Sequence, residues 1–268
     1  YHCMEYQVSY PADMPVAQLT VPASMERPPE LVELQNLRGQ KDDVSNALEG
    51  EGGLRYKAIR QEGLRIGALA GLAQRYGMIM KYLDATESKL NVTFSFNGFV
   101  RDSRLLIPAV IETPNQFIRD PETGKVTEVR QQITIGEEAR VVSVVPTWRD
   151  YLYQEYGMPE RPHSSMLPRT DAEVKAWEDA LSTGWKAGVS QADDIYNDRL
   201  AQLTMAVEGR HLYQTLEQKH LMSPAALKVE SNQVTFNGRT MNVGEIIYTI
   251  GNDTNFTPSS SWRPVWSR

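Results

Sequence analysis

Three aspartates, Asp193, Asp194 and Asp198, come nearest in this chain to a catalytic pattern. Carboxylates at this spacing on a helix could hold a magnesium ion on a diphosphate group. However, acids in the first turn of a helix also stabilise it through the helix dipole, and the sequence shows no converging second set of ligands. We therefore expect the cluster to belong to a helix surface, and we keep a magnesium-dependent enzyme that uses these aspartates as an alternative.

Other patterns of reactive residues are missing from the sequence. No two histidines lie four residues apart on a predicted helix, and there is no zinc-protease, phosphate-loop, dinucleotide or serine-hydrolase motif. The single cysteine, Cys3, can form neither an internal disulfide nor a cysteine-rich zinc site. The sequence therefore predicts no catalytic residue, no cofactor and no metal site. The histidines, expected to be solvated, are His2, His163, His211 and His220.

Trp262 and Trp266 are the candidates for contacts at the C-terminus. They lie in a tail of Ser, Pro and Arg residues, so they either fasten the tail to its own domain or anchor a partner subunit.

Composition places the chain among ordinary globular proteins. It has 268 residues, of which 41% are hydrophobic and 23% charged, and a net charge of −6. A protein that coats nucleic acid usually carries a basic face, so we expect no direct binding of DNA or RNA. No stretch is long and apolar enough to span a membrane.

Helices and strands are expected in blocks rather than in alternation. Apolar residues at helical spacing run over 55–84, where Gly63, Gly67 and Gly71 share one edge that favours close approach of another element. Strands are expected over 92–96, 105–111 and 132–145. A short helix follows at 147–152, then a helix that begins at the capping box of Thr170 and Glu173, and a separate helix over 192–219.

The C-terminal part is expected to be β again. Asn237-Gly238 predicts a hairpin between 233–236 and 240–243, with a further strand over 245–250. The fold class is therefore α+β, with several amphipathic helices on a small antiparallel sheet. Residues 1–53, which are rich in proline and contain one short helix near 30–37, are predicted to form a flexible tether, and residues 54–268 the core domain with its tryptophan-containing tail.

An ordered set of short motifs carries a family resemblance over residues 54–266. No single motif is specific, but together they resemble the DotC family of type IV secretion proteins, which is called TraI in IncI-type conjugative plasmids. The motifs are LRY (54–56), GLRIGALAGLAQRY (63–76), FSF (94–96), LIPAVIE (106–112), ARV (139–141), TWRDYL (147–152), GWKAG (184–188), QAD (191–193) and Trp262.

The resemblance implies a non-catalytic lipoprotein on the periplasmic face of the bacterial outer membrane. It implies a core complex with several copies in a ring, in which a DotD/TraH-like lipoprotein and a DotH/TraN-like protein are the partners, and transfer of plasmid DNA or effector proteins. Cys3 would be the lipid-bearing residue, although His2 before it departs from the small residue that such signals carry. Besides the magnesium-dependent enzyme, a free periplasmic ligand-binding protein is a second alternative.

Overall fold

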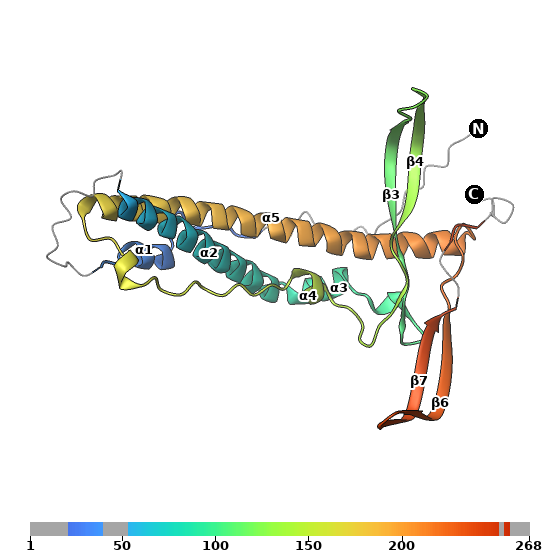
Figure 1. The fold of residues 1–268 in the computed structure, drawn as a ribbon. Coiled ribbons are helices and arrows are strands. Elements are labelled where there is room, and N and C mark those ends of the chain that lie inside the picture. Colours follow the sequence, from blue (N-terminus) through green and yellow to red (C-terminus); the bar gives the residue numbers. More distant parts are fainter. Residues whose placement is uncertain (1–20, 40–52, 252–254, 258–268) are drawn as a thin grey trace. The chain divides into compact units, whose positions relative to one another are not determined.

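The computed structural model describes residues 21–39, 53–251 and 255–257 (Figure 1). About 48% of these residues are helical and 23% lie in strands, which confirms the mixed α+β class. The strands form three small antiparallel sheets. The helices are α1 (Pro29–Gln35), α2 (Leu54–Ala85), α3 (Glu87–Thr93), α4 (Trp148–Leu152) and α5 (Asp171–Gln218), with 3-10 turns η3 (Asn97–Phe99) and η4 (Ser164–Met166). The strands are β1 (Val100–Arg101), β2 (Leu105–Leu106), β3 (Ala109–Arg119), β4 (Val126–Glu137), β5 (Arg140–Val141), β6 (Leu227–Asn237) and β7 (Thr240–Ile250).

The chain divides into two compact units. Of the described residues, those within 17–89 and 152–200 form the helical unit, and those within 90–151 and 201–257 form the hairpin unit. Helix α5 supplies its first part to the helical unit and its last part to the hairpin unit. The sequence-based division at residue 53 stays a prediction.

In the helical unit, α2 and the first part of α5 lie side by side and share one apolar core (Figure 1). Two tryptophans of α5, Trp177 and Trp185, are almost completely buried there. They face Ile59, Ile66 and Ala70 of α2. Burial of large apolar side chains is the main stabilising contribution in such a core.

Glycines let these two helices approach until their backbones touch. A Cβ atom added to Gly67 would lie 2.5 Å from the carbonyl oxygen of Leu181, and one added to Gly71 would lie 2.5 Å from that of Trp185. On the α5 side, Gly184 and Gly188 lie equally tightly against the α2 backbone at Leu64 and Ala68. This confirms the expectation that the glycine edge of α2 receives a second element.

Helix α5 begins as the sequence predicts but does not stop where it predicts. The backbone N–H of Glu173 donates to Thr170 Oγ1 at 3.2 Å, and the Glu173 carboxylate accepts from the N–H of Thr170 at 3.3 Å, which is a capping box. The separate helix expected over 192–219 is wrong, because one helix continues through both segments. Gly188 does not end the helix since it is packed against α2, and no proline interrupts it.

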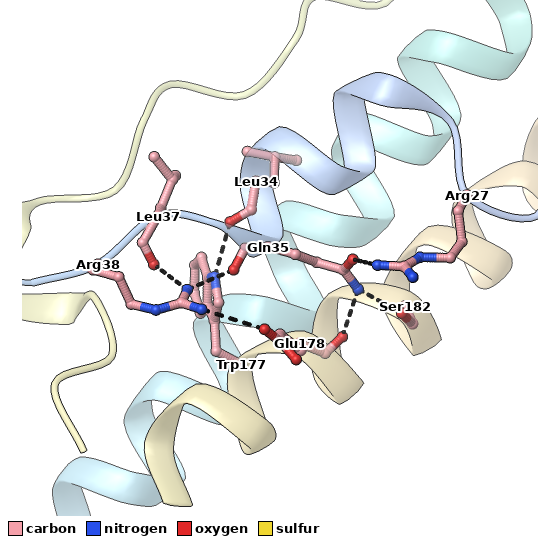
Figure 2. A network of polar contacts seen from close by, with 8 residues as sticks. All are labelled: Arg27, Leu34, Gln35, Leu37, Arg38, Trp177, Glu178 and Ser182. Atoms are coloured by element: carbon pink, nitrogen blue, oxygen red, sulfur yellow. Dashed lines mark hydrogen bonds and ion pairs between the residues drawn. The ribbon is translucent and has the colours of Figure 1, made fainter. Parts of the chain in front are cut away.

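Within the helical unit, the short helix α1 packs against α2 and is hydrogen-bonded to α5, as Figure 2 shows. The side-chain amide of Gln35 donates to the carbonyl oxygen of Glu178 at 3.1 Å and to Ser182 Oγ at 2.8 Å. Trp177 Nε1 donates to the carbonyl oxygen of Leu34 at 2.9 Å, and Leu31 is 2% exposed. A helix is therefore present where the sequence predicts one, and it is fixed to α5. That residues 1–53 act as a tether stays a prediction.

The hairpin unit holds a three-stranded sheet in the order β1-β2-β5 and two separate hairpins, β3–β4 and β6–β7. Its buried residues include Phe96, Phe99 and Trp148, and Leu203 and Val207 of α5. The rings of Phe96 and Phe99 meet edge to face with centroids 5.9 Å apart.

The strand predicted over residues 92–96 is wrong. Residues up to Thr93 belong to helix α3, and the N–H of Phe94 donates to the carbonyl oxygen of Leu90 at 2.9 Å, which adds a helical turn. Val92 is 81% exposed while Phe94 and Phe96 are buried. Three alternating residues are too few to specify a strand, because a helix followed by a turn can bury the same two aromatic rings.

Candidate interaction surfaces

The β3–β4 hairpin exposes apolar side chains on both faces near its tip. Phe117 is paired opposite Glu128, and Ile118 opposite Thr127, so the two apolar residues point to opposite faces. Phe117 is 69% exposed and Ile118 50%. Val126 is 56% exposed and lies diagonally across from Phe117 on the same face. Apolar side chains are therefore exposed on both faces of this hairpin.

The turn that carries this tip is fixed by its own hydrogen bonds. Asp120 accepts from the N–H of Glu122 at 2.9 Å and from Thr123 Oγ1 at 2.8 Å. The hydrogen bond from Thr123 is the largest cause that lowers the pKa of the Asp120 carboxyl, and the hydrogen bond from Glu122 lowers it further. Gly124 has φ of 67°, a conformation that glycine adopts without strain. The turn at the tip is therefore held by hydrogen bonds between its own residues.

The second hairpin, β6–β7, is present as predicted, but it turns at Gly238 and Arg239, one residue later than the expected Asn237-Gly238, because Asn237 is still paired with Thr240. Its second strand runs from Thr240 through Ile250 without a break, so the separate strand predicted over 245–250 is part of β7. Val234 is paired with Val243 and Phe236 with Met241, which puts these four side chains on one face.

Gly244 has a left-handed backbone conformation within β7. Its φ is 73°, and the carboxylate of the following residue, Glu245, accepts hydrogen bonds from Thr235 and Asn242. Several apolar side chains of this hairpin are exposed: Val229, Val234, Phe236, Met241, Val243 and Ile246.

A polar cluster fixes the chain segment that leads from α5 into β6. Tyr213 donates its hydroxyl to Glu217 at 2.7 Å and accepts from the backbone N–H of Ala225 at 2.8 Å. Arg101 pairs with Glu217 at 2.6 Å. Burial raises the pKa of Tyr213, and its bond to Glu217 raises it further. Burial alone would raise the pKa of Glu217, but the hydrogen bonds from Arg101 and Tyr213 lower it overall.

A buried arginine holds the base of β3–β4. Arg210 of α5 is 0% exposed, and it donates to the carbonyl oxygen of Ile107 at 2.9 Å and to Glu137 at 2.7 Å. Its guanidinium also lies 5.8 Å from the ring centre of Phe96. Sequence reasoning did not find this residue. Its only signal was a lone arginine on the buried side of α5, between Val207 and Leu212, and that pattern also fits an exposed side chain.

The aspartates that suggested metal chemistry are placed as parts of a helix. Asp193 accepts from Arg75 Nε at 2.7 Å, and the Arg75 side chain is 7% exposed. Asp194 and Asp198 are exposed on α5. Within residues 21–39, 53–251 and 255–257, no group of three His, Cys, Asp or Glu side chains could hold a metal ion.

Shifted pKa values also occur away from the three aspartates. Burial raises the pKa of Tyr76 and of Tyr196 to about 12 each. The Tyr76 hydroxyl donates to the carbonyl oxygen of Leu152 at 2.7 Å. His211 packs edge to face on Phe99, and burial lowers its pKa. Burial is therefore the main cause of all three pKa shifts. The predicted residues Cys3, His2, Trp262 and Trp266 lie outside the described residues.

Comparison with known proteins decides the family. A family model described as "Type IV secretory system, conjugal DNA-protein transfer" matches residues 53–264. The chain belongs to this TraI family of type IV secretion proteins. No curated protein matches the chain.

Membership places the chain among the subunits of an envelope-associated secretion system that works in conjugation, with other secretion subunits as partners. None of the described helices is long and apolar enough to cross a membrane.

Proposed function

We propose that this TraI-family protein is a non-catalytic structural subunit, and that it binds a neighbouring secretion subunit through the tip of the β3–β4 hairpin. The observation that carries the proposal is the exposure of Phe117 and Ile118 on opposite faces of an ordered hairpin. Exposed apolar residues gathered on one element are typical of protein interfaces.

The size of the hairpin suits insertion between surfaces of a partner. Strands of 11 and 12 residues make faces of roughly 350 Å² each, taking strand rise and strand spacing from ordinary sheets. One face is too small for a stable contact, whereas two faces offer roughly 700 Å², close to the about 800 Å² per partner of a standard interface. A hairpin covered on both faces is therefore the arrangement that we propose.

The DotC/TraI resemblance supports a more specific proposal about the complex and its subunits. We propose an outer-membrane core complex of several copies, in which the neighbours are DotD/TraH-like and DotH/TraN-like proteins and the chain helps to place the latter. We further propose that Cys3 carries a lipid on the periplasmic side of the membrane. Incorporation of a labelled fatty acid into the chain, and its loss in a Cys3→Ser variant, tests the anchor separately from the hairpin.

Affinity purification from membranes of the source bacterium tests the proposed interface. The tagged protein should bring down other secretion subunits, and a Phe117→Ser, Ile118→Ser double variant should lose most of them while its thermal unfolding stays unchanged. Arg60→Ser is the control, because Arg60 is exposed on α2 and is not part of the β3–β4 hairpin. Equal recovery of secretion subunits by the double variant and the control would overturn the proposal.

A further inference from the structure

We propose that the tip of the β6–β7 hairpin lies in the headgroup region of a lipid bilayer, with its apolar side towards the acyl chains. This surface is on a different hairpin from the proposed interface with a secretion subunit, and it does not depend on that proposal. We name it the tip face; it consists of four side chains, Val234, Phe236, Met241 and Val243.

The tip face is apolar and open to water. Val234 pairs with Val243 and Phe236 pairs with Met241, so both cross-strand pairs lie on one side of the hairpin. Phe236 is 77% exposed and Val243 is 70% exposed. Exposed apolar side chains that adjoin one another mark sites where a protein binds another protein or a membrane.

The opposite side of the tip is polar and uncharged; it carries Thr235, Asn237, Thr240 and Asn242. An element with one apolar and one polar side can lie in the plane of a membrane surface. In the described part of the chain β6–β7 is a sheet of two strands, so the outer edge of each strand is unpaired. Unpaired backbone groups are costly in the hydrocarbon interior, which limits the tip to the headgroup region.

The charges of the tip favour a surface rich in phosphate. Arg239, which is exposed in the turn, is the only charged residue over 231–244. The nearest acids along the chain already have partners: Glu230 pairs with Lys228 at 3.0 Å, and Glu245 accepts hydrogen bonds from two residues of the polar side. The tip therefore presents a guanidinium to lipid phosphates and no carboxylate that they would repel.

The turn of the other hairpin has the opposite character. In β3–β4 the turn carries Asp120 and Glu122, and both are exposed. Anionic headgroups would repel these carboxylates, whereas they attract the cation of Arg239. Of the two long hairpins, β6–β7 is therefore the one that suits a lipid surface.

The size of the tip face argues for lipid rather than for a protein partner. Four residues of each strand extend about 14 Å, which with the spacing of two strands gives roughly 130 Å². A standard protein interface buries about 800 Å² on each partner. A bilayer is fluid and needs no matching shape, so the apolar area of a small tip and one cation contribute to binding directly.

Sedimentation with lipid vesicles tests the proposal, using the purified full-length chain in a Cys3→Ser background so that it carries no lipid of its own. This parent chain should sediment with vesicles of phosphatidylcholine that contain a minor fraction of phosphatidylglycerol. A Phe236→Ser, Met241→Ser variant should partition onto them about tenfold less or weaker still, because two large apolar side chains no longer insert. A Phe117→Ser, Ile118→Ser variant is the matched control, since it removes exposed apolar residues from the other hairpin, and it should bind like the parent.

The role of the cation is tested with the same vesicles. Arg239→Gln should weaken binding about fivefold when phosphatidylglycerol is present, since one cation near an anionic surface is lost. Binding to phosphatidylcholine alone should change much less. An equal effect on both kinds of vesicle would overturn the assignment of Arg239 to anionic headgroups.

A polarity-sensitive dye reports which side of the tip meets the lipid. A nitrobenzoxadiazole dye on Met241→Cys should gain emission and shift to the blue when vesicles are added. The same dye on Asn242→Cys, the next residue on the polar side, should change little. Circular dichroism checks that each variant is folded.

Three results would overturn the proposal. The parent chain does not sediment with vesicles, or the Phe236→Ser, Met241→Ser variant sediments equally well, or the dye responds equally at positions 241 and 242. If light scattering shows instead a dimer of the parent chain that this variant abolishes, and vesicles bind neither protein, the tip face binds a second copy rather than lipid.

Discussion

Gly71 of α2 lies against the backbone of Trp185 of α5, so that a Cβ at Gly71 would be 2.5 Å from the Trp185 carbonyl oxygen and 3.0 Å from its Cα. Backbone atoms cannot move aside as a flexible side chain can. The close approach of the two helices therefore depends on the absence of a side chain at this position.

We predict that Gly71→Ala destabilises the protein although alanine favours helices. Overpacking of a tight contact costs about 1–3 kcal/mol, which exceeds the about 1 kcal/mol that alanine contributes over glycine in a helix. Gly77→Ala is the control, because Gly77 is in the same helix and nothing lies within 4 Å of an added Cβ. It should raise the free energy of unfolding in urea, and a Gly71→Ala variant as stable as Gly77→Ala would refute the close packing.

Attachment of α1 is predicted to depend on Gln35. In Gln35→Ala, the hydrogen bonds to Glu178 and Ser182 are lost, at a cost of about 1–3 kcal/mol for a buried group left unpaired (Figure 2). Amide hydrogen exchange over residues 29–38 should accelerate more than in the rest of the helical unit. Glu33→Ala, at a position where the side chain is 75% exposed, should leave this exchange unchanged. Similar acceleration in both variants would contradict the anchoring role.

The hydroxyl of Tyr213 is predicted to fix the start of the β6–β7 segment. Tyr213→Phe removes the acceptor of the buried Ala225 N–H and should lower the free energy of unfolding by about 1–3 kcal/mol. Tyr248→Phe should cost much less, because the contact of its ring with Arg104, 5.5 Å away, does not need the hydroxyl. Urea unfolding of both variants measures the difference, and equal losses would exclude the proposed role of the Tyr213 hydroxyl.

Low pH is predicted to destabilise the hairpin unit because Glu217 becomes protonated. The pKa of this carboxyl is lower in the folded chain than its ordinary value of 4.5, so its ionised form stabilises the fold above that value. The contribution is lost as the pH falls through the lowered pKa. Glu217→Gln removes it, so the stability difference between the wild type and this variant should shrink from pH 6 towards pH 3. A difference that stays constant over this range would show that the ion pair with Arg101 does not shift the carboxyl.

Sequence reasoning succeeded where one local rule decides the structure. The capping box of Thr170 and Glu173, the existence of the β6–β7 hairpin and the glycine edge of α2 were each predictable from a few neighbouring residues. The family resemblance, which rested on the order of many short motifs, is confirmed over residues 53–264.

Features set by contacts between distant segments were not predictable. The continuity of α5 depends on the packing of Gly188 against α2. The predicted strand near Phe94 is absent because a helix and a turn bury that ring instead. The left-handed φ of Gly244 within β7 was likewise not predictable from the pattern of residue types. Exposure of Phe117 and Ile118 could likewise be seen only once the pairing of β3 with β4 was known.

Site-specific photo-crosslinking in the source bacterium tests the central claim, that β3–β4 binds another secretion subunit, most directly. A benzophenone amino acid at position 117 should give adducts with one or more secretion subunits during assembly. The same amino acid at position 60, an exposed position on α2, should give few or none. Adducts absent at position 117, or equally abundant at both positions, would contradict the account.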